Sequence, residues 1–449
     1  MTSRKSASQS PASTTLNRVR ITRKSRFGVS ELRKNYRSNT VKISDVTLTS
    51  TRSVPIAHRL GSFSYAIRNI VGEARQVEAQ GKAVQYLNIG NPPAFGFQPP
   101  AHLIEAVIRA LRDGKNGYGP SAGIEPARAA VANEYSSRGF PVSPERTFIT
   151  SGTSEAIDLV LTATVDEGGE VLVPMPTYPL YTAVIAKLGA RASYYRTDPR
   201  RGLAPDLDHL RSLITPATRV LVVIDPNNPT GASYSETTRR TLLEIAEQHD
   251  LLILADEVYG DLGYEGPVPP IGSLDPDAAV VALSSVSKAY LAPGWRTGWL
   301  GIGRSPRLQE LAAAVGKLAD GRLCSTVPMQ YAVEAALTGD RSHQVMFRVA
   351  LKERAAVTTS SFQAMPGVSC VAPTGAFYAM PKVALPPGRT DEDYVLALLR
   401  STGVLCVHGS GFGTDPADGY FRVVFLAAPD QLRKIYALVA DFTREYLKI

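Results

Sequence analysis

The sequence has few cysteines and histidines and no long apolar run. Its three cysteines, Cys324, Cys370 and Cys406, are an odd number spread over 449 residues, which argues against a disulfide framework. There are six histidines and neither a CxxC nor an HExxH motif, so we expect no metal site. Apolar runs such as 220–224 and 251–255 are five residues long, whereas a membrane span needs about 20. We therefore expect no membrane association.

The positive charge of the chain is concentrated at one end. The formal net charge is +8, yet residues 1–44 alone contain eleven Lys or Arg and one Glu, which leaves 38 basic and 40 acidic residues elsewhere. This segment is rich in Ser and Thr and poor in large apolar residues, so residues 1–57 are expected to form a disordered extension, or to follow from an upstream start codon. A transit peptide is an alternative. Nucleic-acid binding is the least supported one, because no helix-turn-helix pattern accompanies the charge.

From about residue 101, short apolar strands alternate with helices. We predict helices over 105–111, 126–138, 154–165, 181–188 and 235–249, and strands over 147–150, 170–174, 219–224, 251–255 and 278–283. This alternation predicts an α/β fold with a mostly parallel sheet covered on both faces. The hydrophobic content of 44% is enough for a sizeable core. Functional residues in such sheets gather at the carboxyl ends of the strands.

Polar loops follow four of these strands and are expected to converge on one edge. They span residues 150–154, 225–231, 256–259 and 284–288. The first loop opens a helix, where backbone N–H groups and the helix dipole favour an anion such as phosphate, although a plain helix cap is the alternative. No GxxxxGK[ST] motif is present, so a nucleoside triphosphate is not supported.

Two of these loops, and the segment that follows the last of them, carry side chains that suit a cofactor. Asp256 at the end of a buried strand needs a positive partner, such as a protonated ring nitrogen, unless it caps the next turn. Tyr259 could donate a hydrogen bond from the same loop or pack in the core. Lys288 could be a nucleophilic amine in an apolar pocket or an ordinary surface lysine. Arg296 could bind phosphate with its planar fork, or lie in a simple turn.

Taken together, these motifs resemble the class I/II aminotransferases, a family of fold-type I pyridoxal-phosphate enzymes. The resemblance rests on NPTG at 228–231, DEVY at 256–259, SVSK at 285–288, Arg296 eight residues after the lysine, and FRV at 421–423. It extends from about residue 58 to 449. It implies a large domain with a mostly parallel sheet between helices, and a smaller α+β domain built from both chain ends. The implied boundaries are 101–340 for the large domain, and 58–100 and 341–449 for the small one.

The resemblance also implies the catalytic set of Lys288, Asp256 and Tyr259. Lys288 would form the Schiff base with pyridoxal 5′-phosphate and then serve as base and acid for the proton shift. Asp256 would pair with the pyridinium nitrogen, while Asn228 and Tyr259 would donate hydrogen bonds to the ring 3′-oxygen. Tyr178 would stack on the ring face, or serve packing alone.

The remaining implied cofactor contacts are to the phosphate. They come from Gly152, Thr153, Ser154, Ser285, Ser287 and Arg296. Tyr118 resembles the tyrosine that reaches the phosphate from the other subunit, which implies a homodimer with shared active sites.

For the substrate, Arg422 would bind the α-carboxylate as a bidentate pair, assisted by the Gly90 N–H and by Asn228. Tyr65 and Arg68 would line the pocket. Arg68 could receive the distal carboxylate of glutamate, or it could lie on a helix surface. The implied partners are therefore small amino acids and 2-oxo acids.

Within the family, the closest likeness is to alanine (glutamate–pyruvate) aminotransferases, through residues 65–68, 87–97, 322–324 and 374–378. We expect ping-pong transfer of an amino group between an L-amino acid, with alanine favoured, and 2-oxoglutarate. Residues 289–295 are also similar to aromatic-type and broad-specificity members. Aromatic, broad-specificity or biosynthetic transamination, and a lyase or cyclase reaction on the same scaffold, therefore stay as alternatives. A non-enzymatic sensor domain is disfavoured by the intact residue set. We expect a cytoplasmic enzyme, with organellar import through the basic segment left open.

Overall fold

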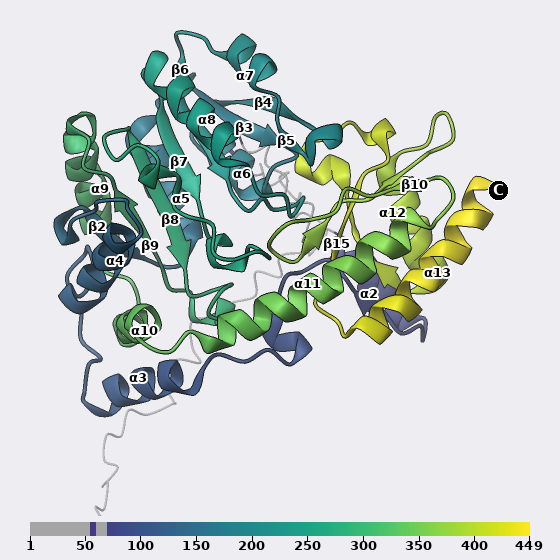
Figure 1. Ribbon diagram of the computed structural model, residues 1–449, viewed down its shortest axis with the longest axis horizontal. Coiled ribbons are helices and arrows are strands. Elements are labelled where there is room, and N and C mark those ends of the chain that lie inside the picture. Colours follow the sequence, from purple (N-terminus) through teal and green to yellow (C-terminus); the bar gives the residue numbers. More distant parts are fainter. Residues whose placement is uncertain (1–53, 60–69) are drawn as a thin grey trace, which may run out of the picture. The chain divides into compact units, whose positions relative to one another are not determined.

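An eight-stranded sheet forms the core of this computed structural model, which describes residues 54–59 and 70–449 (Figure 1). In spatial order the strands are β2 (Thr147–Thr150), β9 (Gly298–Ile302), β8 (Val280–Ser285), β7 (Leu252–Asp256), β6 (Thr218–Ile224), β3 (Glu170–Met175), β4 (Arg191–Asp198) and β5 (Ala204–Pro205). Only β9 and β5 run antiparallel to the other strands of this sheet. The prediction of a mostly parallel sheet is confirmed.

Alternate side chains of the central strands enter two separate cores. Leu221 and Ile253 pack in one core with helices α4 (Glu125–Ser137) and α8 (Glu236–Gln248). Val222 and Leu254 pack in the other core. That second core includes α5 (Thr153–Thr164), α6 (Pro179–Lys187) and α9 (Gln309–Gly321). Since burying one such aliphatic side chain contributes about 1.5–3 kcal/mol, both faces of the sheet stabilise the fold. This two-sided burial explains why the strands are continuous apolar runs.

A second set of short strands combines residues from early and late in the described chain. β1 (Gln85–Tyr86) pairs in parallel with β13 (Val404–Leu405). The antiparallel sets are β11 (Tyr378–Ala379) with β15 (Phe421–Val424) and β14 (Val407–His408), and β10 (Val368–Ser369) with β12 (Lys382–Val383). Residues from 57 to 449 form one compact unit. The boundaries near residues 100 and 340 therefore stay a prediction.

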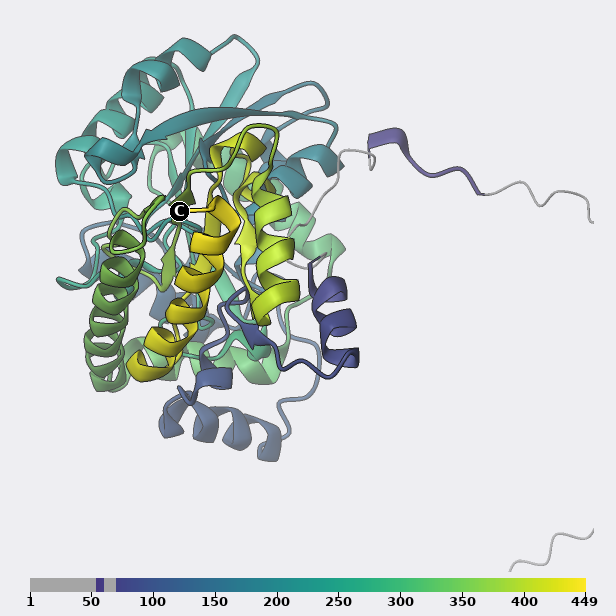
Figure 2. The same cartoon turned by 90° about the vertical axis from the view of Figure 1, so that its right-hand side faces the viewer.

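The remaining helices connect and cover these sheets. They are α2 (Val71–Ala79), α3 (Ala101–Arg112), α7 (Leu207–Leu213), α10 (Val327–Thr338), α11 (Ser342–Gln363), α12 (Asp391–Thr402) and α13 (Pro429–Leu447). Figure 2 shows α11, α13, α12 and α2 side by side in that order. Among the described residues, no helix is long and apolar enough to cross a membrane.

The structure differs from the sequence prediction mainly at strand ends and at β4 and β9, neither of which was predicted. Asp256 and Ser285 are the last residues of β7 and β8, rather than the first loop residues. β9 was not predicted, because its two glycines lower the strand signal. One of them, Gly298, is required by packing, since a Cβ there would come within 2.7 Å of the Thr153 amide nitrogen. This close approach brings β9 against the start of α5.

Candidate active site

A cavity of about 700 Å³ opens where the parallel strands end. Its lining contains twelve of the predicted site residues, which are Gly90, Thr153, Ser154, Tyr178, Asn228, Asp256, Tyr259, Ser285, Ser287, Lys288, Arg296 and Arg422. They come from the loops after β2, β3, β6, β7 and β8, from β15 and from the segment after β1. The predicted convergence of the four loops is therefore observed, although the roles of the individual residues remain predictions.

Asp256 is a buried carboxylate, 4% exposed, at the end of β7. It accepts hydrogen bonds from the Tyr181 hydroxyl at 3.1 Å and from the Val258 N–H at 3.3 Å. No ion pair compensates its charge within residues 54–59 and 70–449. Burial raises the pKa of the Asp256 carboxyl to about 6, despite these donors and the nearby Lys288. The site therefore holds an acidic group that a cationic ligand would stabilise.

Lys288 follows β8 and its amine reaches into the same cavity. Its Nζ donates a hydrogen bond to the Gly90 carbonyl at 3.0 Å. Burial, together with the positive charges of Arg422 and Arg296, lowers the pKa of this amine to about 8, while the negative charge of Asp256 opposes the shift. The Lys288 amine therefore loses its proton more readily than an ordinary lysine near neutral pH, as a nucleophile or base requires.

The loop before α5 and the Arg296 guanidinium form a cradle for an anion. Gly152 precedes the helix with φ of 79°, and a Cβ there would overlap the Arg296 guanidinium. Arg296, itself at φ 49°, donates to the Ser151 carbonyl at 3.3 Å and to the Pro293 carbonyl at 3.2 Å. The Thr153 hydroxyl donates to the Ser284 carbonyl at 3.4 Å, which joins this loop to the end of β8. Helix N–H groups and an arginine fork thus share one corner of the cavity.

Arg422 on β15 is 2% exposed, so it is a buried cation. Its Nη1 donates to Asn228 Oδ1 at 2.9 Å, and its Nη2 donates to the Asn88 carbonyl. The guanidinium also stacks on the rings of Tyr378 and Phe412, at 4.8 and 4.7 Å from their centroids. Oxygen partners and aromatic faces together hold this cation in a fixed orientation.

Tyr378 is the main cavity residue to which the sequence analysis gave no role. Its hydroxyl shares a hydrogen bond of 2.8 Å with the Tyr259 hydroxyl, and the two rings meet edge to face. The segment 374–378 was quoted only for its resemblance to one group of the family. Arg75, Asn91 and Val258 also line the cavity without having been predicted.

Four predicted residues do not line the cavity or lie outside the described part. Tyr118 is 89% exposed and does not line the cavity in the single chain. Tyr65 and Arg68 lie outside the described residues, as does most of the extension 1–57. Gly152 does not line the cavity, although a Cβ at this position would overlap the guanidinium of Arg296, which does.

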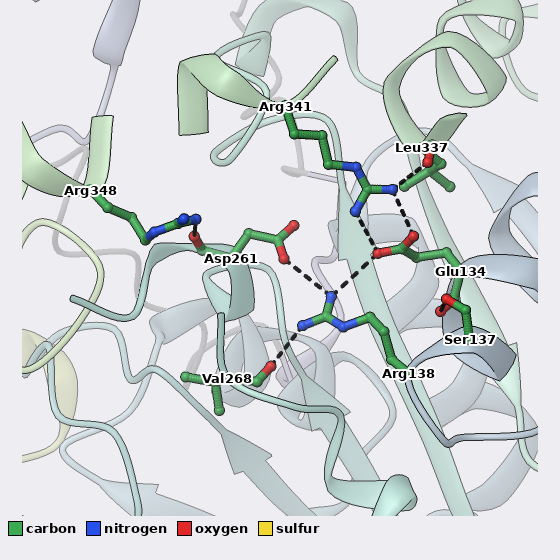
Figure 3. Close-up of polar contacts among 8 residues, drawn as sticks. All are labelled: Glu134, Ser137, Arg138, Asp261, Val268, Leu337, Arg341 and Arg348. Atoms are coloured by element: carbon green, nitrogen blue, oxygen red, sulfur yellow. Dashed lines mark hydrogen bonds and ion pairs between the residues drawn. The ribbon is translucent and has the colours of Figure 1, made fainter. Parts of the chain in front are cut away.

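A polar network supports the loop that carries Asp256 and Tyr259 (Figure 3). Glu134 on α4 accepts two hydrogen bonds from Arg341, which lies just before α11, at 2.7 and 2.6 Å. Arg138 lies between Glu134 and Asp261, at 3.6 and 3.1 Å. Arg348 on α11 donates to the Asp261 carbonyl at 3.0 Å. Because Asp261 follows Tyr259 by two residues, this network joins the loop to both helices.

A model of the family described as aminotransferase class I and II matches residues 83–437. The chain belongs to this family. It is therefore a transaminase that uses pyridoxal phosphate, and the predicted family, fold and cofactor are confirmed.

The relatives of this aminotransferase include several with alanine in their names. The glutamate-pyruvate aminotransferase AlaA of Haemophilus influenzae is 37% identical over 403 residues, which are 88% of this chain and 99% of the relative. The alanine aminotransferase of Mycobacterium tuberculosis is 37% identical over 397 residues, or 86% and 92% of the two chains. A solved alanine aminotransferase from Pyrococcus furiosus has a TM-score of 0.84 at 37% identity, covering 87% and 100%. All three are named as aminotransferases, so their names do not support the alternative of a lyase or cyclase reaction.

The residues of this aminotransferase fit pyridoxal phosphate. The buried Asp256 carboxylate is placed to receive a protonated ring nitrogen, since no other ion pair compensates it in the part of the chain described. Gly152, at φ of 79°, lets the Arg296 guanidinium lie directly against the loop before α5, because a Cβ at position 152 would overlap that guanidinium. A carboxylate for the ring nitrogen, from Asp256, and a guanidinium for the phosphate, from Arg296, are therefore both present.

Proposed function

We propose that this aminotransferase exchanges an amino group between L-alanine and 2-oxoglutarate, giving pyruvate and L-glutamate. The observation that carries the proposal is that Lys288, Asp256 and Arg422 line one cavity. Such a cavity provides an amine, an anion and a carboxylate-binding cation for one small amino acid. The preference for alanine is supported by the names of the relatives from Haemophilus influenzae and Mycobacterium tuberculosis.

Different residues of the chain would bind the ring and the phosphate of the cofactor. Asp256 would face the ring nitrogen, Asn228 and Tyr259 the ring 3′-oxygen, and Tyr178 the ring face. The phosphate would be held by Gly152, Thr153, Ser154, Ser285, Ser287 and Arg296. When bound, pyridoxal phosphate supplies an aldehyde that takes up the amino group and a ring that delocalises negative charge.

The remaining residues act on the substrate. Arg422 would bind the α-carboxylate with its fork, assisted by the Gly90 N–H and Asn228. The Lys288 amine would take the proton from the substrate Cα as a base and return it as an acid. Its lowered pKa of about 8 suits both roles near neutral pH.

We also propose that two copies of the chain share their active sites. The exposed Tyr118, which touches nothing in the single chain's cavity, would reach the phosphate of the partner subunit. Small-domain segments 58–100 and 341–449 would flank the large domain 101–340. The three cysteines are free, which supports a cytoplasmic location. Sedimentation of the purified protein tests the dimer, and a monomer that is fully active would contradict it.

The experiment that tests the reaction is a half-reaction with L-alanine alone. Protein saturated with pyridoxal phosphate should lose its visible absorbance and release pyruvate without ammonia, and adding 2-oxoglutarate should restore the absorbance and yield glutamate. A parallel series with the other amino acids measures the preference. Ammonia release would instead indicate a lyase, and a faster reaction with tyrosine or phenylalanine would indicate an aromatic aminotransferase.

A further inference from the structure

Tyr378 touches both functional halves of the cavity, although nothing in the family motifs points to it. It is the first residue of β11 and is 3% exposed. Its backbone pairs with Val424, two residues after Arg422 on β15. A Cβ on Gly231 would overlap the Tyr378 carbonyl, so the loop that carries Asn228 packs directly against this residue. The position of Tyr378 is thus fixed from two sides.

The side chain of Tyr378 makes two separate contacts. Its ring lies 4.8 Å from the Arg422 guanidinium, the group that would bind the substrate carboxylate. Its hydroxyl lies 2.8 Å from the Tyr259 hydroxyl, the group that would donate to the cofactor 3′-oxygen. Tyr259 is held further by edge-to-face contacts with Phe377 and Tyr378, both at 5.5 Å. One side chain therefore bridges the carboxylate-binding and the ring-binding residues.

The proton count fixes the direction of the hydrogen bond between the two phenols. Each phenol has one proton to donate and can accept through its oxygen. If the Tyr259 proton goes to the cofactor, the proton in the phenol pair must come from Tyr378. An O–H group that accepts a hydrogen bond becomes a stronger donor, so Tyr378 would strengthen the bond from Tyr259 to the 3′-oxygen.

We propose that Tyr378 is a positioning residue that acts through Tyr259 on the cofactor and through its ring on Arg422. The hydroxyl favours negative charge on the 3′-oxygen by donating to Tyr259. The ring keeps the Arg422 fork aligned for the incoming carboxylate. This inference rests on the proposed function only for the cofactor site, and not for the preference for alanine.

The test is a spectroscopic titration of resting enzyme loaded with pyridoxal phosphate, without substrate. Tyr378→Phe should raise the pH midpoint of the visible absorbance band by about half to one unit, because the 3′-oxygen anion loses support. Tyr259→Phe should raise it more. Adding Tyr378→Phe to Tyr259→Phe should change the midpoint little, since the effect passes through Tyr259. An unchanged or lowered midpoint in Tyr378→Phe, or an equal shift in both backgrounds, would overturn the proposal.

A matched control separates this role from simple packing. Tyr264 donates from its hydroxyl to the Ala376 carbonyl at 3.1 Å and does not line the cavity. Tyr264→Phe should therefore leave the midpoint unchanged, and a shift equal to that of Tyr378→Phe would contradict the assignment. If wild-type protein shows no visible band with pyridoxal phosphate, the cofactor site itself fails rather than this inference.

The contact between the Tyr378 ring and the Arg422 guanidinium is tested separately, by the KM for the amino acid. Tyr378→Leu should raise KM for the amino acid about three- to tenfold, because the guanidinium loses an aromatic face. Tyr378→Phe keeps that face and should leave KM within about twofold of wild type. Circular dichroism checks that each variant folds. Equal KM values in the Phe and Leu variants would overturn the role assigned to the ring.

Discussion

The two sides of the cavity handle buried charge in opposite ways. On the strand-end side, formed by the ends of β6, β7 and β8, the Asp256 carboxylate is buried with two hydrogen-bond donors and a raised pKa. On the C-terminal side, formed by β11 and β15, the Arg422 guanidinium has two oxygen partners and two aromatic faces. The first side depends on a ligand for compensation, whereas the second is already arranged before a ligand arrives. Substitutions on the two sides should therefore change different quantities.

The largest effect is expected at Lys288, whose amine belongs to the strand-end side. Lys288→Ala should lower kcat by about a thousandfold or more, since proton transfer and nucleophilic attack both lose their group. Pyridoxal phosphate should still bind without a covalent link, which equilibrium dialysis measures. Lys187→Ala, at an exposed lysine that pairs with Asp158, is the matched control and should keep full activity. Retained turnover in Lys288→Ala would refute the assigned role.

On the C-terminal side, Arg422→Lys should act mainly on substrate capture. An ammonium cannot make the bidentate pair, and a hydrogen bond to a charged group contributes about 1.5–3 kcal/mol, so KM for the amino acid should rise by about a hundredfold. The fall in kcat should be smaller than the rise in KM. Initial rates against substrate concentration separate the two. Arg433→Lys, at an exposed arginine paired with Asp430, should change neither constant. An unchanged KM in Arg422→Lys would contradict the carboxylate assignment.

On the strand-end side, Asp256→Asn should stabilise the cofactor-free protein while removing activity. The folded pKa of the Asp256 carboxyl, about 6, lies above the ordinary 3.8, so this group does not destabilise the folded wild type below about pH 3.8 and destabilises it increasingly as pH rises to about 6. The shift corresponds to about 3 kcal/mol, of which burial of the amide offsets a part, so we expect a gain of about 2 kcal/mol at pH 7.5.

Urea unfolding of cofactor-free protein at pH 4.5 and pH 7.5 measures this gain, which should be clearly larger at pH 7.5. Asp208→Asn, at a carboxylate that is 98% exposed, should show no such pH dependence. A gain of the same size at both pH values would mean that the carboxylate is not the group that destabilises the folded state.

The strand-end side and the C-terminal side of the cavity also differ in how well the sequence predicts them. Asn228, Asp256 and Lys288 lie in short motifs directly after apolar strands, so their convergence follows from the parallel sheet alone. Tyr378 gives no comparable signal, because its partner Tyr259 lies 119 residues away and the contact depends on how β11 packs. Local patterns therefore predict the strand-end side. On the C-terminal side the FRV motif marks Arg422, but the contacts of Tyr378 require the folded chain.

Local sequence patterns also predict some strands of the fold and miss others. Continuous apolar runs such as β6 and β7 were predicted to within two residues, because both of their faces are buried. β9 was missed because Gly298 and Gly301 lower the strand signal, although close packing requires the first glycine and leaves little room beside the second. Polar strands such as β4, with only Tyr195 of its residues fully buried, also lack the apolar signal. The residues 1–53 and 60–69 fall outside the described structure, so the predictions for Tyr65 and Arg68 stand untested.

The smallest effect is expected at Glu134, which lies outside the cavity and belongs to the polar network that holds the loop of Asp256. Glu134→Gln keeps the shape of the side chain but leaves Arg138 and Arg341 without the carboxylate that both of them contact. Because these side chains are only 16–30% exposed, we expect a loss of about 1 kcal/mol in the free energy of unfolding, more than an exposed pair would give. Glu236→Gln removes an exposed pair with Arg240 on α8 and should cost less than about 0.5 kcal/mol. Urea unfolding compares the two variants.

Because the network joins the Asp256 loop to α11, Glu134→Gln should also weaken cofactor binding slightly while leaving KM for the amino acid unchanged. A larger change in KM than in cofactor affinity would show that the network supports the C-terminal side instead.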